Sequence, residues 1–307
     1  MKEAWHLRLG RNGLRLLDSI INLMVLLLFL TGLAFGGYAL WDSRQLYQEA
    51  EAQRYEQYKP AAGDSLTFAQ LQEMNPDVFG WLSVYGTNID YPLVQGEDNA
   101  AYVNTSVTGE SLLSGSIFLD YRNRRDFSDF NSIVYGHHMD RQVMFGEIGE
   151  FSDEAYFEEH PYGNLYVNGR DYGIEFFAFL QVDAYDSRIY TPAIEGEADR
   201  HGYLEYLLEK ALYTRPVGVE SSDRLILLST CTSDATNGRH ILVGKLGTTV
   251  YDDPSQTDTA WEFDGRNLWE WLRPIPMWLW AILLLIAGLF PVIIKRRKGR
   301  KRKESSK

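Results

Sequence analysis

The sequence predicts a mainly β domain of about eight strands, with peripheral helices, held between two membrane-spanning helices. Short runs of β-branched and aromatic residues, divided by Gly, Asn and Asp turns, predict the strands. Two long stretches without charged side chains predict the membrane helices. The 307 residues are 45% hydrophobic and 23% charged, a balance that is typical of a folded chain and excludes a disordered one.

The net charge of −12 is unevenly distributed along the chain. Residues 1–17 hold four basic residues and one acidic residue, and residues 295–307 hold nine basic residues and one acidic residue. The remaining residues comprise 17 basic and 40 acidic side chains, a difference of −23. Because an acidic body repels phosphate, we expect no nucleic-acid partner.

Residues 19–41 form the first stretch without a charge. Its 23 residues, at about 1.5 Å rise per residue, are enough to cross a hydrocarbon core of about 30 Å. A cleaved signal peptide also has a basic start, but this apolar run exceeds the usual 7–15 residues and no clear A-x-A site follows it. We therefore expect an uncleaved transmembrane helix at 19–41, after a cytoplasmic segment at 1–18.

Residues 274–294 form the second stretch, with Trp278 and Trp280 placed as interface anchors. A buried hairpin helix is the alternative, but it does not explain the nine basic residues that follow. The positive-inside rule places both termini in the cytoplasm and residues 42–273 outside the cell. We expect the basic tail, residues 295–307, to contact anionic membrane lipid.

The segments beside the membrane helices are polar. Residues 42–64 are rich in Gln, Glu and Ala and predict an extracellular juxtamembrane helix that ends before Pro60. A capping-box pattern at Thr67–Gln70 predicts a short helix, which Asn75-Pro76 ends. Residues 249–273 are acidic and interrupted by proline, and they are interpreted as a linker to the second membrane helix.

The β-rich domain is predicted over residues 65–248. Its strands are expected at 81–84, 89–94, 116–119, 132–135, 165–167, 172–183, 224–230 and 240–246. Leucines at helical spacing predict a helix over 200–213, between the last strands. This pattern fits a closed barrel or a sandwich.

Cys231 is the only cysteine, so neither an intramolecular disulfide nor a four-cysteine zinc site is possible. It ends the most apolar predicted strand, where a thiol could simply belong to the core. A polar turn follows, however, and Arg239 begins the next predicted strand. If the two strands pair, Arg239 lies beside Cys231, where a guanidinium can stabilise a thiolate and bind an oxyanion.

A thiolate nucleophile also needs a partner that transfers protons. His137 follows Gly136 directly after a predicted strand, and this position suits a ring that faces a cleft. The alternatives are a surface histidine pair, or a metal site built from His137, His138 and Asp140. Because further metal ligands are missing, we expect no metal, and the chemistry of a cysteine nucleophile needs no cofactor.

Together these residues resemble the sortase family. Leu228–Cys231 matches the T-L-x-T-C signature in all but its first position, which is Leu227 here. His137, Cys231 and Arg239 also occur in the sortase order. Further segments that look like class B sortases are residues 80–82, 89–95, 98–99, 115–120 and 144–146, together with the helix before the cysteine strand. The resemblance covers residues 65–247.

The resemblance implies an eight-stranded sortase-type β-barrel and a membrane-anchored cysteine transpeptidase, related to thiol proteases, of a Gram-positive-type cell. By analogy, Cys231 is the nucleophile, His137 the general acid and base, and Arg239 the group that stabilises the substrate carbonyl or oxyanion. Such an enzyme cleaves a C-terminal sorting signal of surface proteins at a Thr-Gly-type bond. It then transfers the thioacyl group to an amine of cell-wall peptidoglycan.

The resemblance also places further residues beside the sorting peptide. They are Asn99, Val103, Ile189, Tyr190, Thr191 and Ser229. Ordinary barrel packing is the alternative for Val103 and Tyr190, and a turn is the alternative for Asn99.

The sequence is also compatible with other functions. A second C-terminal span is commoner among pilin-polymerising sortases, so a lysine amine of a pilin is the alternative acceptor. No lid segment of that type is recognisable, although residues 42–62 could cover the groove. The interval from Cys231 to Arg239 is shorter than in the best-known class B members, so we expect a tight loop.

Two functions of other classes are the further alternatives. A membrane cysteine peptidase would release its product to water, and an inactive adhesion module would be expected to lack one of the three residues His137, Cys231 and Arg239.

Overall fold

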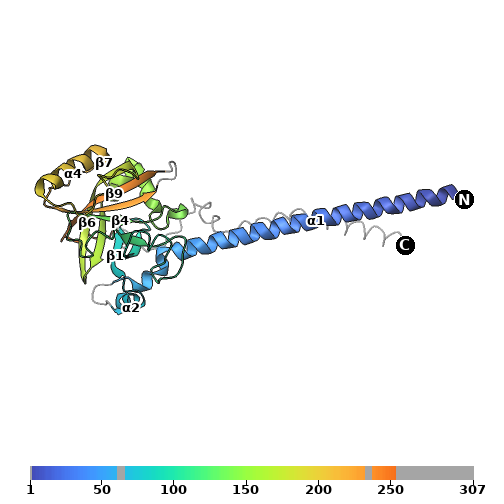
Figure 1. The fold of residues 1–307 in the computed structure, drawn as a ribbon, viewed down its shortest axis with the longest axis horizontal. Coiled ribbons are helices and arrows are strands. Elements are labelled where there is room, and N and C mark those ends of the chain that lie inside the picture. Colours follow the sequence, from blue (N-terminus) through green and yellow to red (C-terminus); the bar gives the residue numbers. More distant parts are fainter. Residues whose placement is uncertain (1, 61–65, 232–236, 254–307) are drawn as a thin grey trace, which may run out of the picture. The chain divides into compact units, whose positions relative to one another are not determined.

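A nine-stranded sheet organises the part of the chain that this computed structural model describes, residues 2–60, 66–231 and 237–253 (Figure 1). The strands are β1 (Val78–Val84), β2 (Asp90–Val94), β3 (Ile117–Leu119), β4 (Asn131–Tyr135), β5 (Tyr162–Val167), β6 (Arg170–Asp183), β7 (Ala211–Thr214), β8 (Arg224–Cys231) and β9 (Gly238–Gly247). They follow the order β5-β1-β2-β3-β4-β8-β9-β6-β7, and a further β5–β6 pairing closes a ring of eight strands. The predicted eight-stranded barrel is therefore confirmed, the sandwich is wrong, and β7 lies outside the ring.

The central strands β4, β8 and β9 are buried on both faces, which explains their nearly continuous apolar sequences. Successive side chains alternate between two cores. Ile226 and Leu228 belong to the core that fills the barrel. Leu225 and Leu227 belong to a second core with Leu207, which lies on the helix α4 (Glu197–Lys210). Two-sided packing holds the ends of these strands in fixed positions.

The predicted helix over 200–213 extends too far. The helix α4 ends at Lys210, and Ala211 adopts an extended conformation with ψ of 134°. The next residues pair with β6 as the strand β7, and the Tyr213 ring stacks on Phe157 of α3 (Glu154–Glu159) at 6.1 Å between centroids. The free edge of β6 supplies hydrogen-bond partners, which outweigh the helical spacing of Leu212. The other predicted short helix is α2 (Leu66–Met74).

The helix α1 (Lys2–Ala50) contains the predicted membrane span. Its residues Ser19–Ala50 include a stretch of 18 residues with a mean hydropathy of 2.2, long and apolar enough to cross a membrane, and no second helix of the described residues qualifies. Residues 42–50 continue α1 without a break, and the helix ends earlier than the sequence suggested. Short 3-10 turns follow at Ala52–Arg54 and Glu56–Tyr58. The predicted second span at 274–294 and the basic tail lie outside the described residues.

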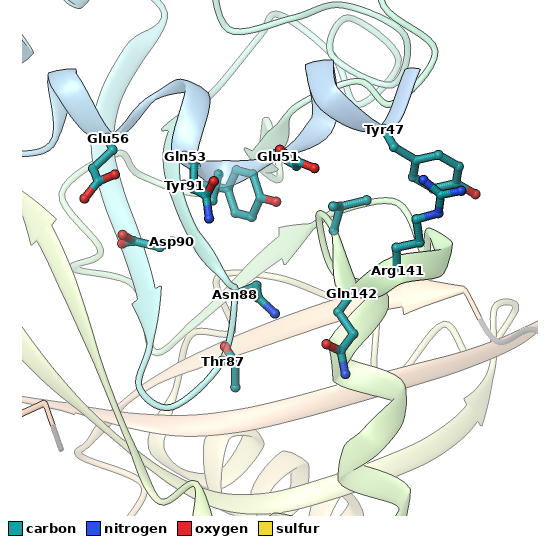
Figure 2. A pocket seen from close by; sticks show the side chains of 12 residues that line it. Tyr47, Glu51, Gln53, Glu56, Thr87, Asn88, Asp90, Tyr91, Arg141 and Gln142 are labelled. Carbon is teal, nitrogen blue, oxygen red and sulfur yellow. The ribbon is translucent and has the colours of Figure 1, made fainter. Parts of the chain in front are cut away.

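The end of α1 lies against the barrel beside a pocket of about 500 Å³ (Figure 2). Tyr47 and Glu51 line it from the α1 side, and Asn88 and Tyr91 line it from the barrel. Arg141 contributes from a second segment, which includes the 3-10 turns Asp140–Gln142 and Gly146–Ser152. The last turn of α1 thus forms part of the packing of the barrel domain.

Candidate active site

A pocket of about 300 Å³ opens where β4 and β8 end and β9 begins. The residues that line it are Asn99, Val103, Phe118, Tyr135, Gly136, His137, Ser229, Thr230, Cys231 and Arg239. All three predicted catalytic residues are therefore brought together, along with Asn99, Val103 and Ser229 of the predicted groove. Phe118, Tyr135 and Thr230 are pocket residues for which the sequence predicts no role. Tyr135 and Thr230 lie within two residues of His137 and Cys231 along the chain, and Phe118 is paired with Tyr135 across two strands.

The register of three strands brings the catalytic residues together. The strands β4 and β8 are parallel, Tyr135 is paired with Ser229, and the Gly136 N–H donates to the Ser229 carbonyl at 3.2 Å. His137 and Cys231 each follow two residues after this pair, so both emerge at one rim of the barrel. The strands β8 and β9 are antiparallel, and their register pairs Cys231 with Arg239. The strand pairing on which the sequence prediction depended is confirmed.

Cys231 carries a free, exposed thiol. Its neighbours Ser229 and Thr230 are each only 2% exposed, so exposure begins at the last residue of the strand. The alternative that Cys231 is an ordinary core residue is wrong. An exposed thiol on a rigid strand end can approach the carbonyl carbon of a bound peptide.

The His137 ring is held by a backbone carbonyl. Its Nε2 lies 2.7 Å from the carbonyl oxygen of Val103, which can only accept, so Nε2 carries a proton. The neutral ring therefore has its lone pair on Nδ1, and the protonated ring can keep the same bond. Val103 thus contributes its backbone to the site, a role that no side-chain pattern in the sequence indicates.

Arg239 has no acidic partner among the residues that the structure describes. Its Nη1 donates to the carbonyl of the adjacent Gly238 at 2.9 Å. The remaining N–H groups of the guanidinium can bind a carbonyl oxygen or an oxyanion in the pocket.

Tyr190 supports the pocket from the loop between β6 and α4. Its hydroxyl lies 2.9 Å from Ser229 Oγ, and its ring stacks on Tyr135 with 6.3 Å between centroids. Burial raises the pKa of Tyr190 to about 12, although the bond to Ser229 and the charge of Arg239 act in the opposite direction. The phenol therefore stays neutral at physiological pH.

Ile189 and Thr191 do not line the pocket. The Ile189 side chain is fully buried in the core beneath α4, and Thr191 Oγ1 donates to the Ser187 carbonyl within the loop. These residues contribute through their backbones. The Ile189 carbonyl accepts from the Tyr203 hydroxyl at 3.0 Å, and the Thr191 carbonyl accepts from Asn131 at 2.8 Å.

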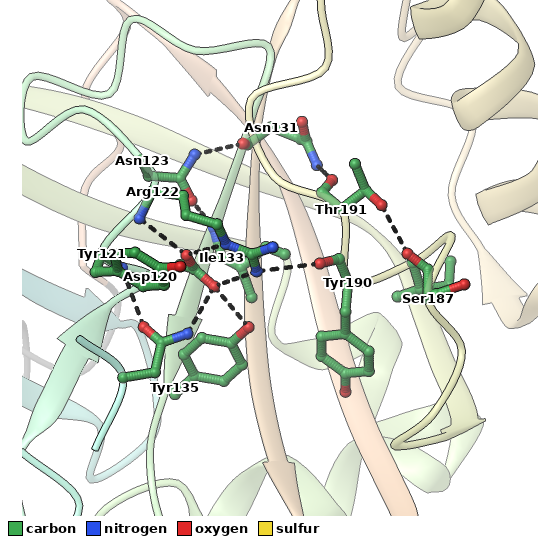
Figure 3. A network of polar contacts seen from close by, with 12 residues as sticks. Asp120, Tyr121, Arg122, Asn123, Asn131, Ile133, Tyr135, Ser187, Tyr190 and Thr191 are labelled. Carbon is green, nitrogen blue, oxygen red and sulfur yellow. Dashed lines mark hydrogen bonds and ion pairs between the residues drawn. The ribbon is translucent and has the colours of Figure 1, made fainter.

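A buried carboxylate, Asp120, bonds two residues of the pocket wall and lies within a polar network (Figure 3). It accepts hydrogen bonds from Arg122 Nη2 at 2.8 Å, from Asn99 Nδ2 at 2.9 Å and from the Tyr135 hydroxyl at 3.0 Å. The Tyr121 N–H donates to Asn99 Oδ1 at 3.0 Å, so both ends of the Asn99 amide are held. Asp120 thereby orients two residues of the pocket wall.

The hydrogen-bond donors around Asp120 favour its ionised form. Burial alone would raise its pKa, but the hydrogen bonds from Arg122 and Asn99 outweigh burial and lower the pKa below the ordinary value of an aspartate. Arg122 Nη2 also donates to the Tyr190 carbonyl at 3.3 Å, so the same network reaches the loop above the pocket. No local sequence pattern predicts this role, since Asp120 is only one residue of segment 115–120, which resembles class B sortases.

Several known proteins are similar to this chain in sequence and in structure. No family model matches the chain. The chain is 37% identical over 180 residues to Sortase B of Listeria monocytogenes, and the match covers 58% of this chain and 73% of the relative. A solved sortase B from the type II pilus of Streptococcus pneumoniae is 51% identical, with a TM-score of 0.52, covering 59% of this chain and 99% of that one.

A second solved relative is a Streptococcus pyogenes class B sortase involved in pilus biogenesis. It is 39% identical, has a TM-score of 0.54, and covers 59% of this chain and 98% of its own. With the closed eight-stranded barrel and the Cys-His-Arg pocket described above, these relationships show that the chain belongs to the class B sortases, a family of cysteine transpeptidases.

Proposed function

We propose that the chain cleaves the C-terminal sorting signal of surface proteins and transfers the new carboxyl end to an amine. The observation that supports this most strongly is the strand register that surrounds one pocket with His137, Cys231 and Arg239. In this proposal Cys231 is the nucleophile, His137 transfers protons, and Arg239 stabilises the oxyanion.

The proposed reaction proceeds in two transfers. The Cys231 thiolate attacks the carbonyl of a Thr-Gly-type bond, and the tetrahedral oxyanion accepts hydrogen bonds from Arg239. Collapse of this intermediate breaks the peptide bond, and His137 protonates the departing amine. An incoming amine then attacks the thioester and gives its proton to His137, and the thiolate is released as the new amide forms. The reaction needs no redox step and no cofactor.

The acceptor has two candidates. Transfer to a peptidoglycan amine is the first, as the analogy with surface-protein anchoring suggests. A lysine amine of a pilin subunit is the second, and the 51% identity to a sortase from a pilus of Streptococcus pneumoniae favours it. The likeness to a Streptococcus pyogenes class B sortase involved in pilus biogenesis points the same way.

The proposed topology places the catalytic domain outside the cell. The apolar part of α1 supports an N-terminal membrane anchor. A second anchor at 274–294 and cytoplasmic positions for both termini follow from the sequence pattern alone. Surface proteins or pilins, the amine acceptor and membrane lipid are the partners that this topology implies.

One experiment separates these reactions. The full chain, purified in detergent, is incubated with an Asn-Pro-x-Thr-type peptide and with either triglycine or a lysine whose α-amine is blocked. Mass spectrometry then identifies the products. Transfer to triglycine supports the cell-wall acceptor, and transfer to the lysine side chain supports the pilin acceptor. Hydrolysis alone supports a cysteine peptidase, which would use the same Cys231 and His137.

Two variants control this experiment. Cys231→Ala should abolish every product, because it removes the nucleophile. Ser187→Ala changes an exposed loop residue outside the pocket and should leave the products unchanged. Products that persist in Cys231→Ala would refute the proposed mechanism.

A further inference from the structure

The end of α1 is bonded to the barrel through one tyrosine. The last four carbonyl groups of a helix lack partners within the helix, and Ala50 contributes one of them. Its carbonyl accepts a hydrogen bond from the Tyr91 hydroxyl of β2 at 2.9 Å. Ala50 and Tyr91 are both buried. Burial raises the pKa of Tyr91, so its hydroxyl keeps the proton that it donates.

The same hydroxyl also contacts the segment that follows His137. It accepts a hydrogen bond from the Met144 N–H at 2.9 Å. The adjacent Phe145 N–H donates to the His137 carbonyl at 3.0 Å, and Met144 forms a bridge with His138. Two hydrogen bonds at neighbouring residues therefore connect Tyr91 to the backbone of His137.

This segment adopts a backbone conformation that needs support. Arg141, Gln142 and Met144 have φ angles of 61°, 59° and 53°, in the left-handed region that residues other than glycine rarely adopt. Such conformations persist only when surrounding contacts hold them. One contact comes again from α1, because the Arg141 guanidinium lies 4.3 Å from the centre of the Tyr47 ring (Figure 2).

We propose that Tyr91 is a positioning residue through which the docked end of the membrane helix holds His137 in its working place. The inference rests on the proposed function, since it assigns His137 a role in proton transfer. Cys231 lies on β8, which the Tyr91 bonds do not contact. Loss of these bonds should therefore slow proton transfer and leave the nucleophile unaffected.

The test compares Tyr91→Phe with Tyr213→Phe in the full chain, reconstituted in phosphatidylglycerol-containing vesicles. Both variants lose a hydroxyl that donates to a backbone carbonyl, but Tyr213 bonds Ser152 from β7, outside the barrel ring. For Tyr91→Phe we expect kcat to fall about 10- to 100-fold, the scale that misplacement of a reacting group produces, with KM within about twofold. Tyr213→Phe should match the wild type.

Two readouts separate positioning from a loss of folded protein. The rate at which iodoacetamide alkylates Cys231 should be the same in wild type and Tyr91→Phe, because β8 stays intact. Amide hydrogen exchange over residues 139–146 should become faster in Tyr91→Phe, because the Met144 N–H loses its acceptor. A changed alkylation rate together with faster exchange throughout the barrel would mean general unfolding and would overturn the inference.

A second variant extends the test to α1 itself. Tyr47→Ala removes the ring that the Arg141 guanidinium contacts, and it should lower kcat as Tyr91→Phe does. If both variants act by releasing the His137 segment, the double variant should lose less than the product of the two single losses. Unchanged kcat in Tyr91→Phe, with active wild type, would overturn the inference. An inactive wild type would count against the proposed function, whereas the exchange experiment would still decide the inference.

Discussion

The hydroxyl of Tyr135 donates a hydrogen bond of 3.0 Å to the buried carboxylate of Asp120. One wall of the candidate active site therefore depends on an ion that has no contact with solvent. Asn99, on the same wall, bonds the same carboxylate. The shape of the pocket and the charge of Asp120 are thus linked.

Replacement of Asp120 by asparagine should destabilise the fold and weaken peptide binding. The variant keeps the size of the side chain but loses the charge that accepts from Arg122, Asn99 and Tyr135. Hydrogen bonds to a charged group contribute about 1.5–3 kcal/mol, so we expect the free energy of unfolding to fall by about 2 kcal/mol and KM to rise several-fold. Denaturation and steady-state kinetics measure both.

Asp171→Asn is the matched control for that variant. Asp171 is exposed and accepts a hydrogen bond of 2.7 Å from Asn164. Its replacement should change the free energy of unfolding by less than about 0.5 kcal/mol. Equal losses in the two variants would show that burial of Asp120 has no special importance.

The stabilisation from Asp120 should depend on pH in one direction. Its folded pKa lies below the ordinary value of about 3.9, so the folded state binds a proton less readily than the unfolded chain. The contribution is complete above about pH 4 and is lost as pH falls through the lower folded pKa. Urea midpoints of wild type and Asp120→Asn should therefore converge as pH falls below 4. A difference between the two midpoints that grows as pH falls would contradict this prediction.

Tyr190→Phe should raise KM a few-fold and leave the pH profile of kcat unchanged up to at least pH 9. The phenol is neutral over this range because burial raises its pKa to about 12. The lost bond to Ser229 should cost about 1 kcal/mol. Ser229→Ala removes the other partner, so in a double-mutant cycle the two effects should be less than additive. Full additivity of the two effects would indicate that the 2.9 Å hydrogen bond between Tyr190 and Ser229 does not contribute to peptide binding.

Arg239→Lys should lower kcat by about 10²–10³-fold, the usual effect of removing one oxyanion donor. A lysine keeps the charge but cannot reproduce the fork of the guanidinium. Arg170→Lys changes an exposed arginine at the start of β6 and serves as the control. A kcat that stays within threefold of wild type would rule out oxyanion stabilisation by Arg239.

The barrel and the catalytic trio could be predicted from the sequence because their signals are local. Cys231, Arg239 and His137 each lie at the end or start of an apolar strand, and strand ends that pair must meet at one rim. The predicted helix over 200–213 is too long at its C-terminal end. Leucine spacing does not reveal that the open edge of β6 competes for residues 211–214.

The support of the site could not be predicted. The contacts of Asp120, Tyr91 and the Val103 carbonyl join segments that are distant in sequence, through hydrogen bonds whose direction depends on loop geometry. The positions of the Ile189 and Thr191 side chains could not be predicted for the same reason. The family resemblance identified their loop, but only the folded chain shows that their side chains point away from the pocket.

The central claim is that Cys231 carries the acyl group during transfer. Mass spectrometry of the full chain, quenched in acid during turnover of an Asn-Pro-x-Thr-type peptide, tests it most directly. We predict an adduct on Cys231 that corresponds to the N-terminal part of the peptide and disappears when triglycine or blocked lysine is added. Turnover without any adduct on Cys231, or an adduct at another residue, would contradict the account.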